Sequence, residues 1–433
     1  MGAKSPGAAE IWGVISRGYA PSASVASVFD AYAPEFVEDP YPTYARLRAE
    51  SPVFFDETWG VTFFARHADV AGILRDRRFG RDVRDAVPAE KVDREVYDRI
   101  YPPQWPTWTE TIRDSFIDLE PPRHTRIRRL VQWAFTRRAS ETYRDRMQAT
   151  TDDALDRAVE AGSMEAIADF ATPIPLTMIA ELLGVPTSDQ PMLVEWSHRI
   201  VRVFDEACTA EEGDAAEAAT KEFVAYCEEL LADHRRNPRD DLVTALIDAE
   251  VDGDRLTEQE LAATCILALN AGHEATVQAI GNGLLALAAN PGEYERLRAE
   301  PGLMATGADE LLRYDTPLQM FERWVLEDLE WHGTPLEQGS KVGLLFGSAN
   351  HDEAVFEVPS GLDLGRAPNA HVSFGGGVHF CVGAPLAKVE MDVAFTTFAE
   401  RIASFEVAAE ELPRVPSLIF RGVGELPLAL TPA

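Results

Sequence analysis

Apolar residues recur every three or four positions in several long stretches of the chain, and this spacing predicts amphipathic helices. The clearest stretch runs from Leu261 to about Ala289 and stops before Pro291. It opens with Thr257-Glu-Gln-Glu260, a capping box that satisfies the free amides of a helix start. Another helix is expected after residue 385, where two rows of apolar side chains follow each other: Leu386, Val389, Val393, Phe395, Phe398 and Ile402.

The N-terminal part of the chain is predicted to combine strands with helices. A short helix is expected from Pro40 to Arg48. The segments Val53–Phe55 and Trp59–Ala65 are typical of two strands joined by a tight turn at Asp56–Thr58. A helix is expected over His67–Arg75.

The span Ala86–Leu119 is predicted to be irregular, because prolines at positions 102, 103 and 106 interrupt it. Its aromatic side chains include Trp105, Trp108 and Phe116. They either anchor a long loop to the core or form the wall of a pocket, since long loops in compact domains are often functional.

Residues 163–250 are helical in pattern, with breaks expected near Gly184–Pro186 and Glu211–Asp214. These breaks leave paired helices around 187–206 and 215–236. The first 25 residues are expected to be flexible. Residues 26–433 are expected to form one domain, because neither an internal repeat nor a low-complexity run divides them.

Composition narrows the class of protein. The formal net charge of −32 argues against nucleic acid or an anionic membrane as a partner. No apolar run reaches the 18 residues that a membrane-spanning helix needs, and a cytoplasmic location is expected. The four cysteines are far apart, which suggests neither a disulfide framework nor a zinc cluster.

Cys381 lies in a glycine-rich loop directly before the predicted C-terminal helix. Gly375, Gly376 and Gly377 precede it and Gly383 follows, so the backbone can turn sharply and come close to a flat ligand. Amides at a helix start and the helix dipole would stabilise an anionic sulfur. A thiolate held in this way can be the axial ligand of a haem iron. A buried cysteine beside an ordinary glycine turn is the alternative.

The spacing around Cys381 decides between these alternatives. Phe374, Gly377, Cys381 and Gly383 match F-x-x-G-x-x-x-C-x-G, which resembles the haem-ligand signature of the cytochrome P-450 family. The resemblance implies a mainly α (α+β) fold, with a large helical part, a smaller β region, and haem b between the long helix 261–289 and the Cys381 loop.

The same resemblance assigns cofactor-binding residues. His124 and Arg128 are four positions apart on one helical face, and in isolation they would be a solvated pair. Within the family, His-x-x-x-Arg resembles the pair that holds a haem propionate, and a guanidinium suits a carboxylate. Arg323 resembles the second propionate-binding arginine, and His379 joins this set.

The middle of the long helix resembles the family's oxygen-binding groove, (Ala/Gly)-Gly-x-(Asp/Glu)-Thr-(Thr/Ser). Gly272 and Glu274 match it, Thr276 fills its last position, and Ala275 stands where the family usually has threonine. A side chain one residue further along is rotated by about 100°, so Thr276 is not assumed to replace the missing hydroxyl. Glu274, Thr276, an ordered water or a substrate hydroxyl remain candidates for that role.

Two further groups of residues follow from the resemblance. Glu310 and Arg313, an i, i+3 pair, resemble the pair that buttresses the Cys side of the core, with Arg366 as the expected third member. Apolar pocket walls are expected from positions 317–321 and 417–420. With the loop aromatics, the pocket candidates are Trp105, Trp108, Phe116, Leu318, Met320, Ile419 and Phe420.

A local cluster of arginines is the exception in this acidic chain, with six of them between positions 123 and 138. By resemblance, the face around the Cys loop receives an acidic ferredoxin-type electron donor. The candidate docking residues are Arg126, Arg129, Arg137 and Arg138; solvent-facing arginines without a partner are the alternative.

The resemblance implies a bacterial-type haem-thiolate monooxygenase that inserts one atom of O2 into a hydrophobic small molecule, aromatic compounds included, by hydroxylation or O-dealkylation. Electrons would come from NAD(P)H through a ferredoxin reductase and a ferredoxin. Ala275 keeps open a peroxide-driven or atypical member, for example one catalysing oxidative coupling. A haem-binding sensor or carrier without turnover is the alternative from another class.

Overall fold

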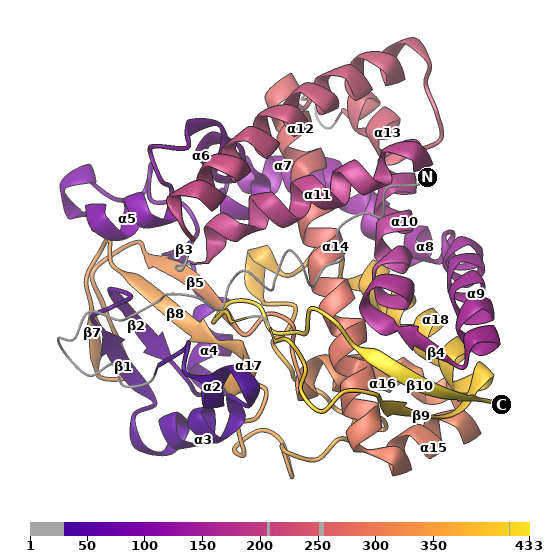
Figure 1. The fold of residues 1–433 in the computed structure, drawn as a ribbon. Coiled ribbons are helices and arrows are strands. Elements are labelled where there is room, and N and C mark those ends of the chain that lie inside the picture. Colours follow the sequence, from indigo (N-terminus) through magenta and orange to yellow (C-terminus); the bar gives the residue numbers. More distant parts are fainter. Residues whose placement is uncertain (1–29, 206–207, 251–254, 415) are drawn as a thin grey trace.

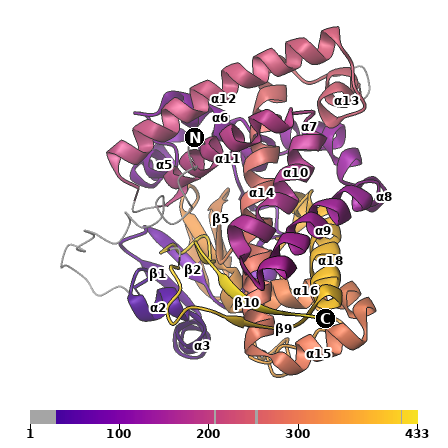
Figure 2. The ribbon, with the colours of Figure 1, turned by 45° about the vertical axis from the view of Figure 1, so that its right-hand side comes forward.

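A computed structural model describes residues 30–205, 208–250, 255–414 and 416–433. Helices make up one side of the molecule and a smaller sheet the other, as predicted (Figure 1). The long helix α14 (Glu258–Ala289) runs through the middle of the helical part (Figures 1 and 2). The N-terminal segment expected to be flexible, residues 1–25, lies outside the described residues.

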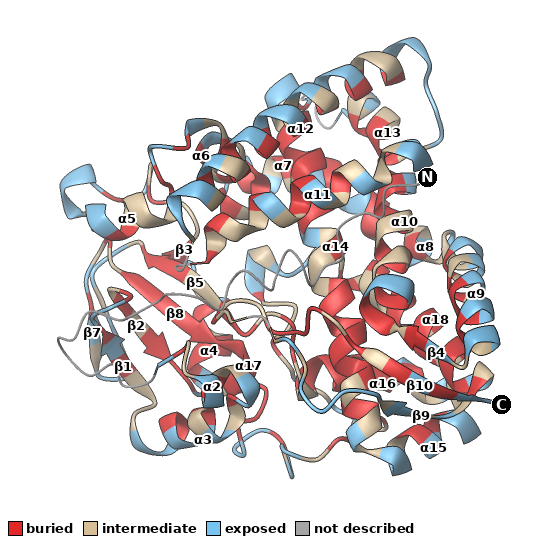
Figure 3. Ribbon diagram, viewed as in Figure 1, coloured by how far each residue is buried: buried red, intermediate tan, exposed pale blue. Residues whose placement is uncertain are grey.

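The main sheet has five strands in the order β1-β2-β8-β5-β3. Strands β1 (Val53–Asp56) and β2 (Val61–Phe64) form the predicted hairpin, although its turn is longer than expected. Strand β2 pairs in parallel with β8 (Lys341–Leu345), and β8 pairs antiparallel with β5 (Met320–Val325). Strand β3 (Phe79–Gly80) closes the far edge. Every residue of β8 is buried, so this strand is the centre of the sheet (Figure 3).

Helix α14 is the most buried long element of the protein. Its capping box is present as predicted, with Thr257 and Glu260 satisfying each other's backbone amides, and the helix begins at Glu258. Beside it lie α10 (Pro173–Leu182), α16 (Met304–Tyr314) and α18 (Ala384–Arg401). Figure 3 shows buried residues, in red, along each of these helices. The apolar rows read from the sequence are therefore the core-facing sides of α14 and α18.

Helices α11 (Gln190–Val201) and α12 (Ala210–Arg236) pack against each other and cover the end of α14 (Figure 2). The break expected at Glu211–Asp214 is wrong, because these residues form the first turn of α12. Thr209 and Glu212 make a capping box there, and acidic side chains are favourable at the positive end of a helix dipole.

The irregular structure predicted for Ala86–Leu119 is also wrong in part. This span contains α5 (Arg94–Ile100) and α6 (Pro106–Arg113). Pro106 occupies the first helical position, where its missing N–H costs nothing, so it starts a helix instead of breaking one. The 163–250 region likewise begins with a short strand, β4 (Ser163–Glu165), that pairs with the C-terminal β10 (Pro427–Pro432).

The remaining elements complete the two sides. They are α2 (Pro34–Glu38), α3 (Tyr41–Glu50), α4 (His67–Ile73), α7 (Arg123–Val131), α8 (Arg137–Glu141), α9 (Arg144–Ala161), α13 (Leu242–Asp248), α15 (Pro291–Ala299), α17 (Phe346–Ala349), β6 (Leu329–Trp331), β7 (Thr334–Leu336) and β9 (Ile402–Val407). Among the described helices, none is long and apolar enough to cross a membrane.

Candidate active site

The loop before α18 presents Cys381 to a large cavity. The amide of Cys381 donates to the carbonyl of Phe374 at 2.9 Å, which closes the loop. Gly377 has a φ of +64°, and a Cβ at this position would lie 2.3 Å from the backbone oxygen of Leu74. Only glycine fits there, because both the backbone conformation and the close approach exclude a side chain.

The sulfur of Cys381 has the surroundings of a metal-binding thiol. Burial raises the pKa of this thiol, while the backbone amides of Gly383 and Ala384 and the charge of Arg128 act in the opposite direction. Without a cation to bind, the thiol would stay protonated at neutral pH. A metal ion at the sulfur would displace the proton and make it the ligand.

Helix α7 brings its two predicted residues to the same cavity. Arg128 donates from Nη2 to the carbonyl of Phe380 at 2.7 Å, which ties α7 to the Cys loop. The ring of His124 lies 4.3 Å from the ring of His379. Neither ring nitrogen of the buried His124 has a hydrogen-bond partner within the described residues.

A group of buried cations surrounds these histidines. Burial, and then the nearby Arg81, lower the pKa of Arg323 to about 9. Burial and Arg323 lower the pKa of His379 to about 2, although its Nε2 lies 3.1 Å from Glu120 Oε1. Arg81 also lines the cavity and donates to the carbonyl of Glu322 at 2.9 Å.

This cationic group fits the carboxylates of a haem. Buried cations are costly without an opposite charge: Arg81 is paired with Asp118, while burial and Arg81 depress the pKa of Arg323, so the Arg323 guanidinium favours a further anion nearby. Two propionates would supply that charge and would also give His124 a partner for its ring. The anion site and Cys381 line one cavity, so the residues present fit haem b.

On the opposite wall, Glu274 of α14 is held by two histidines. Its Oε1 lies 3.2 Å from Nε2 of His198 on α11 and 3.6 Å from Nδ1 of His273. Burial raises the pKa of Glu274, but the two histidines outweigh it and the net pKa lies well below the usual range. Glu274 is thus an ionised carboxylate beside the cavity.

Thr276 faces a different partner from Glu274. Its hydroxyl interacts with the carboxyl of Glu390 on α18: burial raises the pKa of Glu390 to about 8, and the Thr276 hydroxyl acts in the opposite direction. Glu390 is therefore largely protonated at neutral pH, and the Thr276 hydroxyl is engaged with it. Ala275 lines the cavity between these two acids without a polar group. For Gly272, the nearest atom to an added Cβ would be Cδ1 of Ile179, at 3.3 Å.

The cavity has a volume of about 580 Å³, and most of the predicted wall residues line it. An isolated β-bridge between Leu318 and Phe420 brings the two expected wall segments side by side. Those that line the cavity are Trp105, Phe116, Leu318, Met320, Ile419 and Phe420.

Trp108 is placed elsewhere, so the expectation that it lines the pocket needs correction. Its fully buried indole donates to the carbonyl of Ile200 at 2.9 Å and anchors α6 to α11. Trp105 both lines the cavity and donates to Asp214 at 2.9 Å. Gly213 of α12 leaves room for this indole, because a Cβ there would lie 1.7 Å from it. The aromatic loop residues thus serve both of the predicted purposes.

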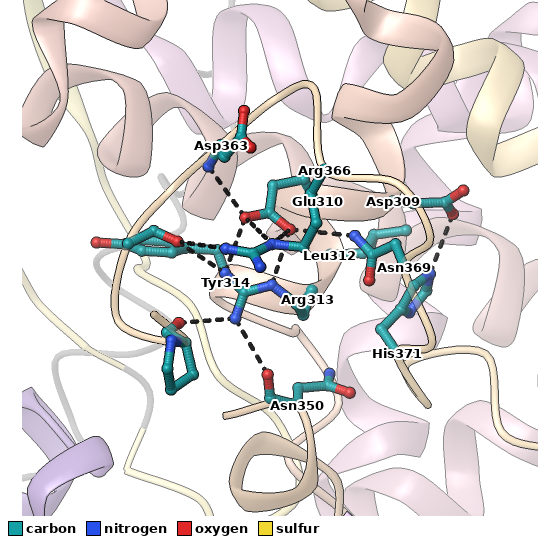
Figure 4. Close-up of polar contacts among 12 residues, drawn as sticks. Asp309, Glu310, Leu312, Arg313, Tyr314, Asn350, Asp363, Arg366, Asn369 and His371 are labelled. Carbon is teal, nitrogen blue, oxygen red and sulfur yellow. Dashed lines mark hydrogen bonds and ion pairs between the residues drawn. The ribbon is translucent and has the colours of Figure 1, made fainter. Parts of the chain in front are cut away.

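Glu310 and Arg313 of α16 form a fully buried ion pair, and Arg366 joins it (Figure 4). Arg366 Nε lies 3.0 Å from Glu310 Oε2, and Arg313 also donates to the carbonyl of Asn350 at 3.1 Å. The side-chain amide of Asn369 donates to Glu310 at 3.1 Å. This network holds the segment that leads into the Cys loop.

Sequence reasoning missed Arg81, Glu120, His198 and Glu390. Arg81 and Glu120 flank the site from loops with no spacing pattern, and only tertiary contacts bring His198 to Glu274. Glu390 has no distinguishing signal, because Lys388 and Asp392 flank it in the C-terminal helix.

Comparison with known proteins agrees with this geometry. The family described as Cytochrome P450 matches residues 92–304 and 302–417. The polyketide biosynthesis cytochrome P450 PksS of Bacillus subtilis is 33% identical over 93% of this chain and 99% of its own. Nocardicin C N-oxygenase of Nocardia uniformis is 37% identical over 90% of this chain and 95% of its own.

A crystal structure of P450BioI in complex with an acyl carrier protein has a TM-score of 0.85, at 32% identity over 93% of this chain and all of that one. The chain belongs to the cytochrome P450 family, and it is a haem-dependent monooxygenase.

Proposed function

We propose that this monooxygenase inserts one atom of O2 into a free, hydrophobic small molecule, by hydroxylation or O-dealkylation. The observation that carries the proposal is a single cavity with Cys381 at one side, a buried cation group at its edge and apolar walls above. Aromatic compounds are among the candidate substrates, since Trp105, Phe116 and Phe420 contribute to those walls.

Haem, when bound, supplies the oxygen-activating chemistry, and a thiolate ligand favours O–O cleavage. The chain contributes orientation and charge. Cys381 is the proposed ligand, and Phe374, Gly377 and Gly383 shape its loop. His124, Arg128, Arg323 and His379 are proposed to bind the propionates, with Arg81 as a further cation close by.

Glu274 is the proposed proton relay to the cavity. It is ionised and lies beside His198, so a proton can pass from the imidazole to the carboxylate and on through water. Thr276 is engaged by Glu390 and is a weaker candidate than the sequence suggested.

Electrons are proposed to come from NAD(P)H through a reductase and a ferredoxin that docks beside the Cys loop. Helix α7 contacts this loop through Arg128, and Arg129, Arg137 and Arg138 are exposed on and after it. Trp133 is 46% exposed in the same segment and gives an apolar centre to a basic surface. Arg126 pairs with Glu260, so we place it outside the docking surface.

We propose a free substrate instead of one attached to an acyl carrier protein such as the one bound to P450BioI. Near the cavity roof, the cations Arg199 and Arg202 are paired with Glu195 and Glu212 of this chain.

A peroxide-driven or atypical reaction is the second candidate, favoured by Ala275 and by the engagement of Thr276 with Glu390. The experiment compares product formed per NADH consumed, using a ferredoxin system, with turnover supported by H2O2. Tight coupling with ferredoxin and no peroxide activity supports the first proposal. Turnover with H2O2 alone supports the second.

A further inference from the structure

The side chain of Trp105 forms a piece of wall between the cavity and the surface of the protein. Trp105 is 7% exposed and lines the cavity, whereas its chain neighbours Pro103, Gln104 and Pro106 are exposed. Gln104 also lines the cavity, so the cavity comes close to solvent beside the indole. A change in the position of this one ring would therefore alter access to the cavity.

The backbone of Trp105 is fixed at the start of α6. Its carbonyl accepts from the amide of Thr109 at 2.9 Å. Glu217 of α12 accepts from the amides of Thr107 and Trp108, at 3.2 and 2.9 Å, and so docks the start of α6 on α12 (Figures 1 and 2). A movement of Trp105 is therefore a rotation of its side chain and not a displacement of the helix.

The indole of Trp105 is held by a hydrogen bond and by a slot in α12. Its Nε1 donates to Oδ1 of Asp214 at 2.9 Å, and Asp214 is exposed. The slot is at Gly213, where an added Cβ would lie 1.7 Å from Cζ2 of the indole. Because water can replace the indole at an exposed carboxylate, the net strength of this hydrogen bond is modest and the contact is reversible.

We propose that the Trp105 side chain is a gate to the cavity, and this inference rests on the proposed function. In the closed position, the indole fills the slot at Gly213 and donates to Asp214. Rotation of the side chain breaks this hydrogen bond, moves the ring toward solvent and opens the cavity beside Gln104. Because Glu217 keeps α6 docked, this opening does not require α12 to move.

The test measures how fast 4-phenylimidazole binds to and leaves haem-loaded protein, by stopped-flow absorption. Asp214→Ala removes the acceptor of the indole, so the gate should be open more often. Both the association and the dissociation rate constants are expected to rise by the same factor, about threefold to tenfold. The dissociation constant should change by less than about twofold, because a gate alters access and not the contacts of the bound ligand.

Glu222→Ala is the matched control. Glu222 is also an exposed acid of α12 that accepts from an indole, that of Trp196 at 2.8 Å, but Trp196 does not line the cavity. Both rate constants should therefore stay at the wild-type values. Equal rate changes in Asp214→Ala and Glu222→Ala, unchanged rates in Asp214→Ala, or a change in the dissociation constant alone would overturn the inference.

Trp105→Phe separates the gate from other effects of Asp214. A phenyl ring has no N–H to donate, so adding Asp214→Ala to Trp105→Phe should alter neither rate constant further. A full effect of Asp214→Ala in that background would overturn the inference. Wild-type protein that carries no haem would overturn the proposed function instead.

Discussion

The imidazole Nε2 of His198 lies 3.2 Å from the carboxylate of Glu274 and joins helix α11 to helix α14. Burial lowers the pKa of His198, but the Glu274 carboxylate more than offsets this, and the net pKa is raised. The pair links the cover of the cavity to the carboxylate proposed to relay protons, so it couples stability and catalysis to pH.

We predict that His198→Gln lowers the free energy of unfolding by about 1–3 kcal/mol near pH 6. The raised pKa of His198 adds stability that is complete below its unfolded pKa and is lost as pH rises through the folded value. The lowered pKa of Glu274 adds stability that is present above its unfolded pKa. The difference between wild type and variant should therefore be largest between about pH 4.5 and 6.5 and shrink above that range.

Urea unfolding at several pH values measures this difference. His273→Gln is the matched control, because its Nδ1 is further from Glu274, at 3.6 Å, and its effect should be smaller. An equal loss at all pH values would show that His198 contributes packing alone.

Glu390 should make stability fall as pH rises. Burial raises its pKa to about 8, so the folded protein holds a proton that the unfolded chain loses above about pH 4.5. We expect Glu390→Gln to remove this fall of stability with pH. The free energy of unfolding of the variant should therefore rise by a few kcal/mol relative to the wild type between about pH 5 and 8. Asp392→Asn, on the same helix but beside Arg144, should leave the pH slope as it is. Parallel slopes for Glu390→Gln and wild type would refute the buried-acid description.

Removing the carboxylate of Glu310 should be severe. Glu310→Gln leaves Arg313 fully buried without its counter-charge, and such a loss typically costs about 3–5 kcal/mol. We expect lower unfolding free energy and less haem per protein, since the network holds the segment before the Cys loop. Glu195→Gln, at an exposed pair with Arg199, should change stability by less than about 0.5 kcal/mol. Similar losses in both variants would contradict a special role for Glu310.

Ala275→Thr should keep haem and alter the release of peroxide, measured as product and H2O2 per NADH consumed. The substitution adds a hydroxyl at position 275, where the groove of the family usually has a threonine and this chain has an alanine. Thr276→Val should change these ratios much less, because the Thr276 hydroxyl already interacts with the carboxyl of Glu390. A larger effect from Thr276→Val than from Ala275→Thr would show that Thr276 serves the groove.

The sequence predicted the site best where function restricts the local backbone. The spacing around Cys381 requires glycines at fixed positions, and Gly377 indeed has no room for a side chain. Likewise, the third member of the Glu310 network could be chosen by its place before the Cys loop. Such features are local, so one sequence is enough to recognise them.

Features that depend on tertiary contacts could not be predicted. Periodicity places Thr276 on a helix but does not say that Glu390, more than a hundred residues away, takes its hydroxyl. The sequence predicts an interruption at Pro106, although a proline also starts a helix well. In the sequence, Trp108 cannot be told from Trp105, because both are aromatic residues of the same proline-rich span. Only the packing of α6 on α11 shows that Trp108 is an anchor and not a wall residue.

The most direct test of the account is the ferrous–CO absorption spectrum of wild type and Cys381→Ser, recorded on purified, haem-loaded protein. Thiolate ligation predicts the long-wavelength band of the family in the wild type, and its loss in the variant. A variant spectrum identical to that of the wild type would contradict the assignment of Cys381 as the iron ligand.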